Sequence, residues 1–583
     1  MKNLAITLAL AALLTACGSR QPDTTADLIL LNGHIYTAND AQPQVQAIAV
    51  KDGKILAAGS DAEVRALAGT DTQVLDLAGK RVMPGLIDAH THPIAGGMSL
   101  SAANMDDEIV ELAELETRLR QWRDDGRAQL AEGILQIVGM NSAYWAQAKA
   151  LDERFSQGEW ADTAVLLLGS DHHTAWANAK LRQLAGLDKA LLASLPAAER
   201  ANIGAFADGQ PSGFVVDSGL DRVSAALPPE SPETLLHGAQ AAVQYYNAVG
   251  VTGWLDAAAA SAPKADEAAD APSPRTLGML PGYKALAEKG GLNAHVAALI
   301  VANPKSRPQD LDAVETIRAQ FAGIPNLTLP GIKIFADGVL EYPAHSAALL
   351  EPYTDSGKPG ELLIDPQHFG ELVTAADKRG WLVHVHAIGD RAVRESLNGY
   401  EQARKAGDSG IAHSITHLQL VSPDDFPRFK QLNVIAAMQL LWAAGDEYTI
   451  DMVQPYISAT AFKYQYPANS LLRAGATLAG ASDWPVSSGN PWEAIAQAMT
   501  RKGDKGVLNS DEIVPREAMF QAYTLNAAKV LQLESKIGSL AAGKQADFVV
   551  LDRDVFTVTP EELAETKALS TWFAGKVVYQ AGE

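Results

Sequence analysis

One short segment constrains the fold more than any other part of this chain. Residues 82–92 form an apolar run that ends in His90-Thr91-His92. Side chains two residues apart on a strand point to the same face, so both imidazoles are expected to project together from the end of a buried strand. Two converging imidazoles are typical of a metal site. The alternative is a pair of surface or packing histidines.

The two ends of the chain carry short β-type runs. At the N-terminal end they are separated by Asn32-Gly33 and Asp52-Gly53, dipeptides that favour tight turns between strands. Residues 547–552 and 571–579 repeat the strand pattern at the other end, and the long middle alternates strand and helix signals. We therefore predict β-rich parts over residues 27–83 and 536–583 that bracket an α/β domain over residues 84–535.

The first residues have the features of a secretion signal. A charged start is followed by an apolar run, residues 4–14, that is too short for a permanent membrane helix. Leu14-Thr15-Ala16-Cys17 fits a bacterial lipobox, and Cys17 is the only cysteine of the chain. We predict a signal peptide over residues 1–16, lipidation at Cys17 and a tether over residues 17–26, which would place the protein in the cell envelope on the outer membrane, facing the periplasm.

The overall charge argues against one class of partner. The chain has a formal net charge of −22 and no basic stripe that could neutralise phosphates, so we expect no nucleic-acid partner. With 583 residues it is long enough to bury a large core and a satellite domain. Oligomeric state stays open.

Several ordered motifs resemble those of one known family. Beside residues 84–92, five segments are similar to motifs of the family 3 branch of the amidohydrolase superfamily, which includes enzymes of the N-substituted formamide deformylase type. The five are residues 169–178, 332–338, 384–392, 416–417 and 481–486. The resemblance spans nearly the whole chain beyond the predicted signal peptide.

The resemblance implies a fold and a metal site. The implied fold is an α/β, TIM-type (β/α)8 barrel with its site at the C-terminal ends of the strands, plus a small β-sandwich built from both termini. His90 and His92 would bind one metal, His386 and His417 would bind a second or complete a shared site, and Asp483 would contact both metal and nucleophilic water. The cofactor would be one or two divalent ions per chain, with zinc favoured by the nitrogen and carboxylate ligands.

Lys333 is a special case within the implied ligand set. A cationic lysine would repel metal ions, and the resemblance implies instead that Lys333 is carbamylated and bridges two metals as an anion. The alternatives are a lysine that reaches to the rim and one that pairs with Asp337.

Three further residues have competing interpretations. His173 resembles a substrate-binding histidine of the family and is a candidate catalytic residue; the alternative is a satisfied polar residue of a loop. His384 shares a strand face with His386 and is the second choice of ligand in that strand. Asp390, at a strand-to-helix junction, is either a helix N-cap or a substrate contact.

The chain also departs from the family pattern. Thr416 stands where relatives commonly carry Glu, which removes a hydrogen-bond acceptor beside His417. Residues 257–274 are rich in Ala, Asp and Pro and are expected to form a surface loop. Residues 95–250 exceed a simple connection between strands and should form a lobe over the site. Trp145, Trp160 and Trp176 are candidates for a substrate wall within it, with core packing as the alternative.

These observations lead to a predicted activity. We expect hydrolysis of a non-peptide carbon–nitrogen bond, in an amide, N-acyl or N-formyl group of a small-molecule substrate, by metal-activated hydroxide with Asp483 moving the proton. Ester, carbamate or cyclic-amide hydrolysis at the same site is the nearest alternative. A lipoprotein that binds a small molecule without catalysis, or serves as a structural partner in the envelope, is a more distant one.

Overall fold

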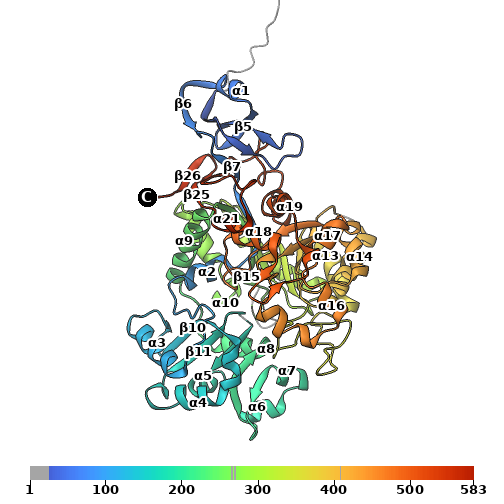
Figure 1. The fold of residues 1–583 in the computed structure, drawn as a ribbon. Helices are drawn as coiled ribbons and strands as arrows, with labels where there is room; N and C mark the ends of the chain where they lie inside the picture. The colour runs from blue at the N-terminus through green and yellow to red at the C-terminus, as the bar shows by residue number, and fades with distance from the viewer. Residues whose placement is uncertain (1–24, 172, 264–266, 268–270, 408, 583) are drawn as a thin grey trace, which may run out of the picture.

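The computed structural model describes residues 25–171, 173–263, 267, 271–407 and 409–582. The predicted signal peptide, Cys17 and nearly all of the tether lie outside the described residues. Within the described ranges, no helix is both long and apolar enough to cross a membrane. Figure 1 shows a β-sandwich at the top, a barrel in the middle and a separate lobe at the bottom.

The sandwich combines both termini, which confirms that part of the predicted fold. Apolar side chains of its two sheets, among them Ile48 and Phe548, are buried in one common cluster. Asp52 and Gly53 both have positive φ, as the tight turn between two of its strands requires. The strands are β1 (Ala26–Leu31), β4 (Ala47–Lys51), β5 (Lys54–Gly59) and β6 (Ala68–Asp76) in one sheet, and β2 (His34–Tyr36), β3 (Gln44–Val45), β7 (Arg81–Pro84), β24 (Phe548–Leu551), β25 (Ala568–Phe573) and β26 (Lys576–Gln580) in the other.

The middle of the chain forms an eight-stranded parallel barrel, as predicted. Its strands are buried on both faces, which is why they read as nearly continuous apolar runs. At Gly331 a side chain would collide with the carbonyl of Leu382 on the next strand, so the strand pairing there requires glycine. The strands are β8 (Leu86–Thr91), β15 (Val251–Ser261), β16 (His295–Val301), β17 (Leu327–Phe335), β18 (Leu382–Ala387), β19 (His413–His417), β20 (Val434–Met438) and β21 (Thr477–Gly480).

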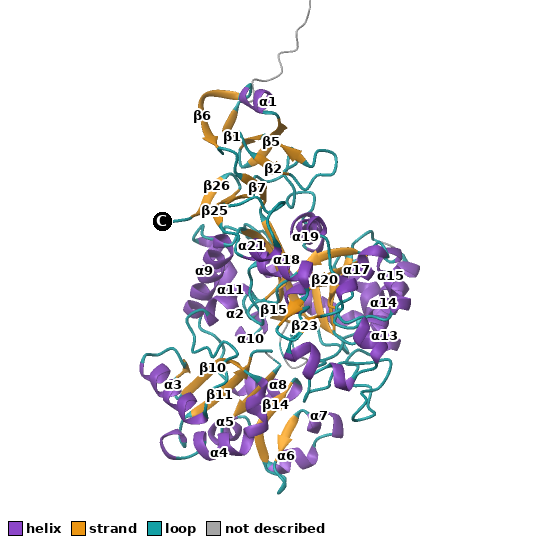
Figure 2. Ribbon diagram, in the orientation of Figure 1, coloured by secondary structure: helices purple, strands orange, loops and turns teal. Residues whose placement is uncertain are grey.

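Helices cover the outside of the barrel (Figure 2). In α14 the buried residues recur with helical periodicity, for example at Val393, Leu397 and Tyr400, so one face packs on the sheet. The covering helices are α2 (Pro93–Ser99), α9 (Pro232–Ala248), α11 (Leu280–Glu288), α12 (Leu311–Gln320), α13 (Pro366–Lys378), α14 (Asp390–Ala406), α15 (Phe426–Gln431), α17 (Ala468–Arg473), α18 (Pro491–Thr500), α19 (Arg516–Gln521) and α20 (Ala527–Val530).

Asp88 joins the first and last strands of the barrel. Its carboxylate accepts hydrogen bonds from the backbone N–H groups of His90 and Ser482, at 3.1 Å each, and from the Tyr246 hydroxyl at 3.0 Å. The backbone N–H of Asp483 donates to the His90 carbonyl at 2.8 Å. The ends of β8 and β21, far apart in sequence, are therefore held side by side.

A lobe with its own sheet is inserted between β8 and β15. It has separate apolar cores, whereas α9, which follows it, packs against α2 of the barrel. The sheet contains β9 (Gln129–Ala131), β10 (Ile134–Met140), β11 (Ala164–Gly169), β12 (Thr174–Ala177), β13 (Ile203–Ala205) and β14 (Pro211–Val216). Around it lie α3 (Leu112–Asp124), α4 (Ala148–Phe155), α5 (Ala179–Leu184), α6 (Lys189–Ser194), α7 (Ala197–Ala201) and α8 (Ser218–Ala226).

Two sequence-based expectations about local structure are wrong. Residues 257–261 do not belong to a surface loop but extend β15, in which Ala260 and Ser261 pair with Ile300 and Val301 of β16. α10 (Pro274–Leu277) begins at the last residue of the expected loop. Trp160 and Trp176 do not line a substrate wall, because both are fully buried in the core of the lobe.

Candidate active site

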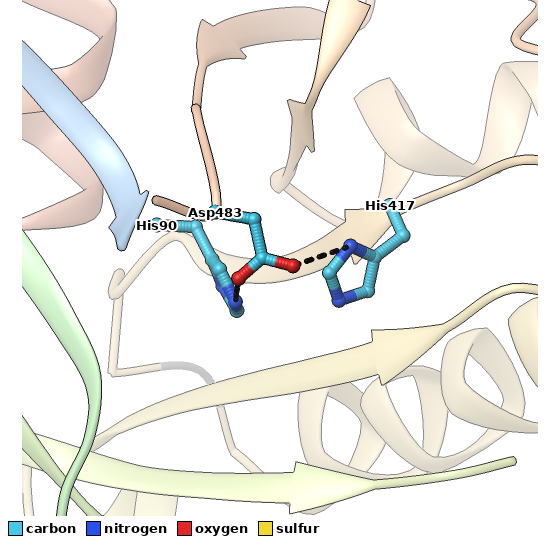
Figure 3. Close-up of side chains that lie close together, drawn as sticks. All are labelled: His90, His417 and Asp483. Carbon is cyan, nitrogen blue, oxygen red and sulfur yellow. Dashed lines mark ion pairs between the residues drawn. The ribbon is translucent and has the colours of Figure 1, made fainter. Parts of the chain in front are cut away.

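Three side chains meet at the C-terminal ends of barrel strands (Figure 3). His90 lies in β8, His417 ends β19, and Asp483 follows β21. They offer ligand atoms that all lie within 4.8 Å of one another. Asp483 Oδ1 is 3.2 Å from His90 Nε2, and Oδ2 is 3.9 Å from His417 Nδ1. The strand ends thus form a buried His-His-Asp cluster.

The chemistry of this cluster fits a divalent cation. His92 Nε2 lies 3.1 Å from Asp483 Oδ1, on the same oxygen as His90 Nε2. That oxygen is buried and accepts no hydrogen bond from any described residue. A buried carboxylate oxygen without a hydrogen bond is costly, and a metal ion among imidazole nitrogens would satisfy it.

The imidazoles around the cluster are held in their neutral form. Burial, reinforced by the nearby amine of Lys333, lowers the pKa of His90 to about 3. Burial likewise holds the pKa values of His386 and His417 well below the ordinary value of histidine. A neutral imidazole has the lone pair that a metal requires.

The backbone is strained at two of the cluster residues. His417 has φ 73° and Asp483 has φ 59°, in the left-handed region that residues other than glycine rarely adopt. Each such residue costs roughly 1–3 kcal/mol, and surrounding contacts must compensate. The strain turns both side chains inward where their strands end.

The two histidines of β18 have different surroundings. His384 Nε2 lies 2.7 Å from His90 Nδ1, and its own Nδ1 lies 2.6 Å from Ser414 Oγ. His386 has its ring centre 4.5 Å from that of His417, and its Nε2 donates to the Gly338 carbonyl at 3.0 Å. His386 therefore has Nδ1 left for a metal, whereas His384 contacts the far side of a ligand.

Lys333 lies beneath the cluster in β17. It is 1% exposed, so it does not reach to the rim, and no ion pair with another described residue is formed. The carboxylate of Asp337 instead accepts backbone hydrogen bonds from Ala348, Ile388 and Gly389. Burial lowers the pKa of Lys333 to about 7. Lys333 therefore neither reaches to the rim nor pairs with Asp337, the two alternatives to a modified lysine.

A cavity of about 320 Å³ opens above the cluster, between the barrel and the lobe. Its lining includes Asp483, His386 and His417 from the barrel, and His173 and Trp145 from the lobe. Trp145 alone of the three candidate tryptophans lines this cavity, and its indole N–H donates to Thr174 Oγ1 at 2.9 Å. The cavity has the size of a small-molecule site.

His173 is held at the cavity wall by a carboxylate. Its Nδ1 lies 2.8 Å from Asp217 Oδ1. Although burial alone would favour the neutral ring, the hydrogen bond and charge of Asp217 raise the pKa of His173 to about 9. A protonated or N–H-donating imidazole therefore faces the His-His-Asp cluster across the cavity.

The structure also shows the surroundings of Asp390 and Thr416. Asp390 is the first residue of α14 and lines a different hollow, where its carboxylate accepts the backbone N–H of Leu350 at 2.9 Å. Gly389, and not Asp390, is the N-cap residue of the helix, and Asp390 does not line the cavity above the cluster.

Thr416 Oγ1 accepts a hydrogen bond from Gln439, whose side-chain carbonyl oxygen is 3.2 Å from His417 Nδ1. Gln439 thus supplies the hydrogen-bond acceptor beside His417 that the replacement of Glu by Thr416 was expected to remove.

No motif in the sequence indicates Asp217, Gln439 or Ser414 as site residues. Each is a single polar residue with no motif around it, and each acts through a histidine from a distant segment. Only the strand pairing and the position of the lobe bring them into contact. A polar residue one strand away from a motif histidine is the only signal that could have indicated Gln439 and Ser414.

Comparisons with known proteins agree along nearly the whole chain. The protein-family model described as "Amidohydrolase family" matches residues 73–579 of this chain. Protein LONG AFTER FAR-RED 3 of Arabidopsis thaliana is 29% identical over 571 residues, covering 95% of this chain and 92% of its own. N-substituted formamide deformylase of Arthrobacter pascens is 26% identical over 578 residues, covering 95% and 98%.

Solved structures share the fold. An uncharacterized metal-dependent hydrolase from Pyrococcus horikoshii superimposes with a TM-score of 0.70 at 24% identity, over 92% of this chain and 99% of that one. A second, from Pyrococcus furiosus, has a TM-score of 0.67 at 25% identity, over 90% and 99%. Each of the two matches covers at least nine-tenths of this chain.

Proposed function

The chain belongs to the amidohydrolase family, and from this premise we propose that it hydrolyses a carbon–nitrogen bond outside the peptide backbone, in a small amide, N-acyl or N-formyl substrate. One observation carries the proposal: a buried carboxylate oxygen without a hydrogen bond lies between two imidazoles at the base of the cavity between the barrel and the lobe. The name of the formamide deformylase, which aligns along 95% of the chain, supports an N-formyl or related substrate.

His90, His92, His417 and Asp483 would hold a divalent ion, with zinc favoured by the donor set, and His386 would join them through Nδ1. Such an ion supplies Lewis-acid activation of water and of the substrate carbonyl. Asp483 would accept a proton from the attacking water on Oδ2, the oxygen that does not face His90 and His92, and return it to the leaving nitrogen. The neutral histidines keep the cluster ready for a cation without first releasing protons.

His173 takes the substrate on the opposite side of the cavity. Its imidazole N–H donates a hydrogen bond to the carbonyl oxygen, on which negative charge grows as water attacks. Apolar wall residues such as Trp145 lower the local dielectric and so strengthen that interaction.

We further propose that Lys333 is carbamylated. In this reaction the neutral amine nitrogen forms a bond to the carbon of carbon dioxide and releases a proton, which leaves an anionic carbamate. A buried lysine with a lowered pKa that forms no ion pair with another described residue is suited to it, although the charge of Asp483 partly opposes the shift. Growth or incubation with ¹³C-bicarbonate should give a carbamate carbon signal in NMR that is absent from Lys333→Met; a wild-type spectrum identical to that of the variant would rule the carbamate out.

The proposed activity is tested by substrate screening with two matched variants. The purified protein is assayed against formamides, N-acyl amines, lactams, carbamates and esters. Asp483→Asn should lower kcat by at least about 100-fold while metal stays bound, because the variant cannot accept the proton. Asp124→Asn, an exposed carboxylate of the lobe, should behave as wild type.

The screen separates the alternatives. Turnover of esters or cyclic amides alone would replace the proposed substrate class but keep the site. Saturable binding of an amide with no product from any compound would favour a binding protein, and retained turnover in Asp483→Asn would refute the role of that residue.

Membrane attachment is a separate proposal, based on the sequence around Cys17. Full-length protein expressed in a bacterium should sediment with the membrane fraction, and Cys17→Ser should release it or leave its signal peptide uncleaved. Equal sedimentation and equal processing of both would contradict lipidation.

A further inference from the structure

A short chain of hydrogen bonds links the lobe to the barrel beside the cavity. His173 Nδ1 is 2.8 Å from Asp217 Oδ1, and the Ser346 hydroxyl donates to Asp217 Oδ2 at 3.0 Å. The backbone N–H of Val339 donates to Ser346 Oγ, also at 3.0 Å. His173 and Asp217 belong to the lobe, whereas Val339 and Ser346 belong to the loop that follows β17. Both carboxylate oxygens of Asp217 are therefore used, one by each part of the protein.

The backbone of Asp217 is strained to make this contact. The residue has φ 45° and ψ −114°, a conformation that a side chain disfavours. It stands at the N-cap position of α8, where Asp usually accepts a backbone N–H of the first turn, yet its side chain makes no such bond. The carboxylate is directed at His173 instead of the helix, so its position serves the histidine.

The bond to Asp217 determines which nitrogen of His173 faces the substrate. A carboxylate accepts hydrogen bonds and cannot donate them, so Nδ1 carries a proton. Nε2 is then the nitrogen open to the cavity, on the side where the ring centre lies 5.7 Å from that of His386. Asp171 secures the backbone beneath the ring, because its carboxylate accepts the N–H groups of His173 and Thr174 at 2.9 Å each.

We propose that Asp217 is a positioning residue, held by Ser346 of the barrel, that fixes His173 so that its Nε2–H donates to the substrate carbonyl. The inference rests on the proposed function and adds a requirement to it: the lobe completes the active site instead of merely covering it. The carboxylate stabilises positive charge on the ring when His173 polarises the carbonyl.

A purely structural role for Asp217 makes a different prediction. If the residue only joined the lobe to the barrel, its loss would lower stability and would affect activity whether or not His173 is present. If it acts through His173, its loss has no further effect once that histidine is gone. A double-mutant cycle separates the two.

The experiment measures kcat and KM for wild type, Asp217→Asn, His173→Gln and the double variant, on a substrate found in the screen. Asp217→Asn should lower kcat about 100-fold, more than it raises KM, with the bound metal and the melting temperature retained. In the His173→Gln background the same change should alter kcat less than twofold. Glu199→Gln, which removes a lobe carboxylate from an ion pair with Arg222, serves as the matched control and should leave kcat unchanged.

Two results would overturn the inference while the proposed function stands. One is wild-type kcat in Asp217→Asn, and the other is an equal loss of kcat in the presence and absence of His173. The failure of the proposed function is recognised separately, because Asp483→Asn would then keep its turnover.

Discussion

At the residue scale, the account depends on which nitrogen of each histidine is free. His90 has Nε2 directed at Asp483 and Nδ1 bonded to His384, whose other nitrogen contacts Ser414. A partner on the far nitrogen of a ligand fixes the orientation of the ring and raises its basicity. His384 is therefore expected to act on the metal through His90.

His384→Phe tests this role. The variant keeps a ring of similar size but cannot accept the proton of His90 Nδ1, so metal affinity should fall by about 10–100-fold, as measured by competition with a chelator. The number of ions bound at saturation should not change. Unchanged affinity would refute the positioning role, and a lower stoichiometry would show that His384 is itself a ligand.

Residues that belong to motifs could be predicted from the sequence, and those that act through them could not. His90, His92 and Asp483 were expected in one site, and the strand ends bring them together. Asp217 was not expected, because nothing near residue 217 in the sequence indicates that the lobe brings it to His173. The local patterns reveal the ligands, whereas tertiary contacts supply their partners.

At the element scale, a buried carboxylate ties two helices to a barrel strand. Asp377 of α13 accepts hydrogen bonds from Arg404 of α14 at 3.1 Å and from His413 Nε2 of β19 at 3.0 Å. Although burial would raise it, the hydrogen bonds from His413 and Ser409 and the charge of His413 lower the pKa of Asp377 to about 2. The sequence predicted alternating strands and helices in this part of the chain, but no pattern indicated that Asp377 would join them.

Asp377→Asn should destabilise the fold by about 3 kcal/mol near pH 7, since it removes the charge opposite a buried arginine. The folded-state pKa is depressed, so the stabilisation is present above the unfolded value near 3.8 and is lost as the pH falls through about 2. Denaturant unfolding at pH 7 and pH 3 should show a larger difference between the two proteins at pH 7. An equal difference at both pH values would contradict the assignment.

At the scale of the whole molecule, the site lies where two parts of the chain face each other. Described residues that line the cavity include four carboxylates besides Asp483 and neither lysine nor arginine: Asp107, Asp171, Glu341 and Asp446. The barrel and the sandwich could be expected from the resemblance of the motifs to one family, whereas the strand patterns and turn dipeptides alone indicated β-rich ends around an α/β middle. The shape and charge of the cavity could not, because they depend on how the lobe docks.

This lining predicts a preference among substrates. A formamide or N-acyl derivative of a neutral or cationic amine should have a higher kcat/KM than the same compound with an added carboxylate, by about tenfold for a cost of ~1.4 kcal/mol from like-charge repulsion. The comparison uses matched pairs from the screen at low ionic strength. A preference for the carboxylate-bearing partner would contradict the prediction.

The central claim is that the His-His-Asp cluster holds a catalytic metal, and the most direct test is the metal content of the purified chain. One or two equivalents of zinc or another divalent ion should be found by elemental analysis, and a His90→Ala, His92→Ala variant that remains folded should lose at least one of them. A well-folded wild-type protein that stays free of metal after growth and refilling with ample zinc, manganese and iron would contradict the account.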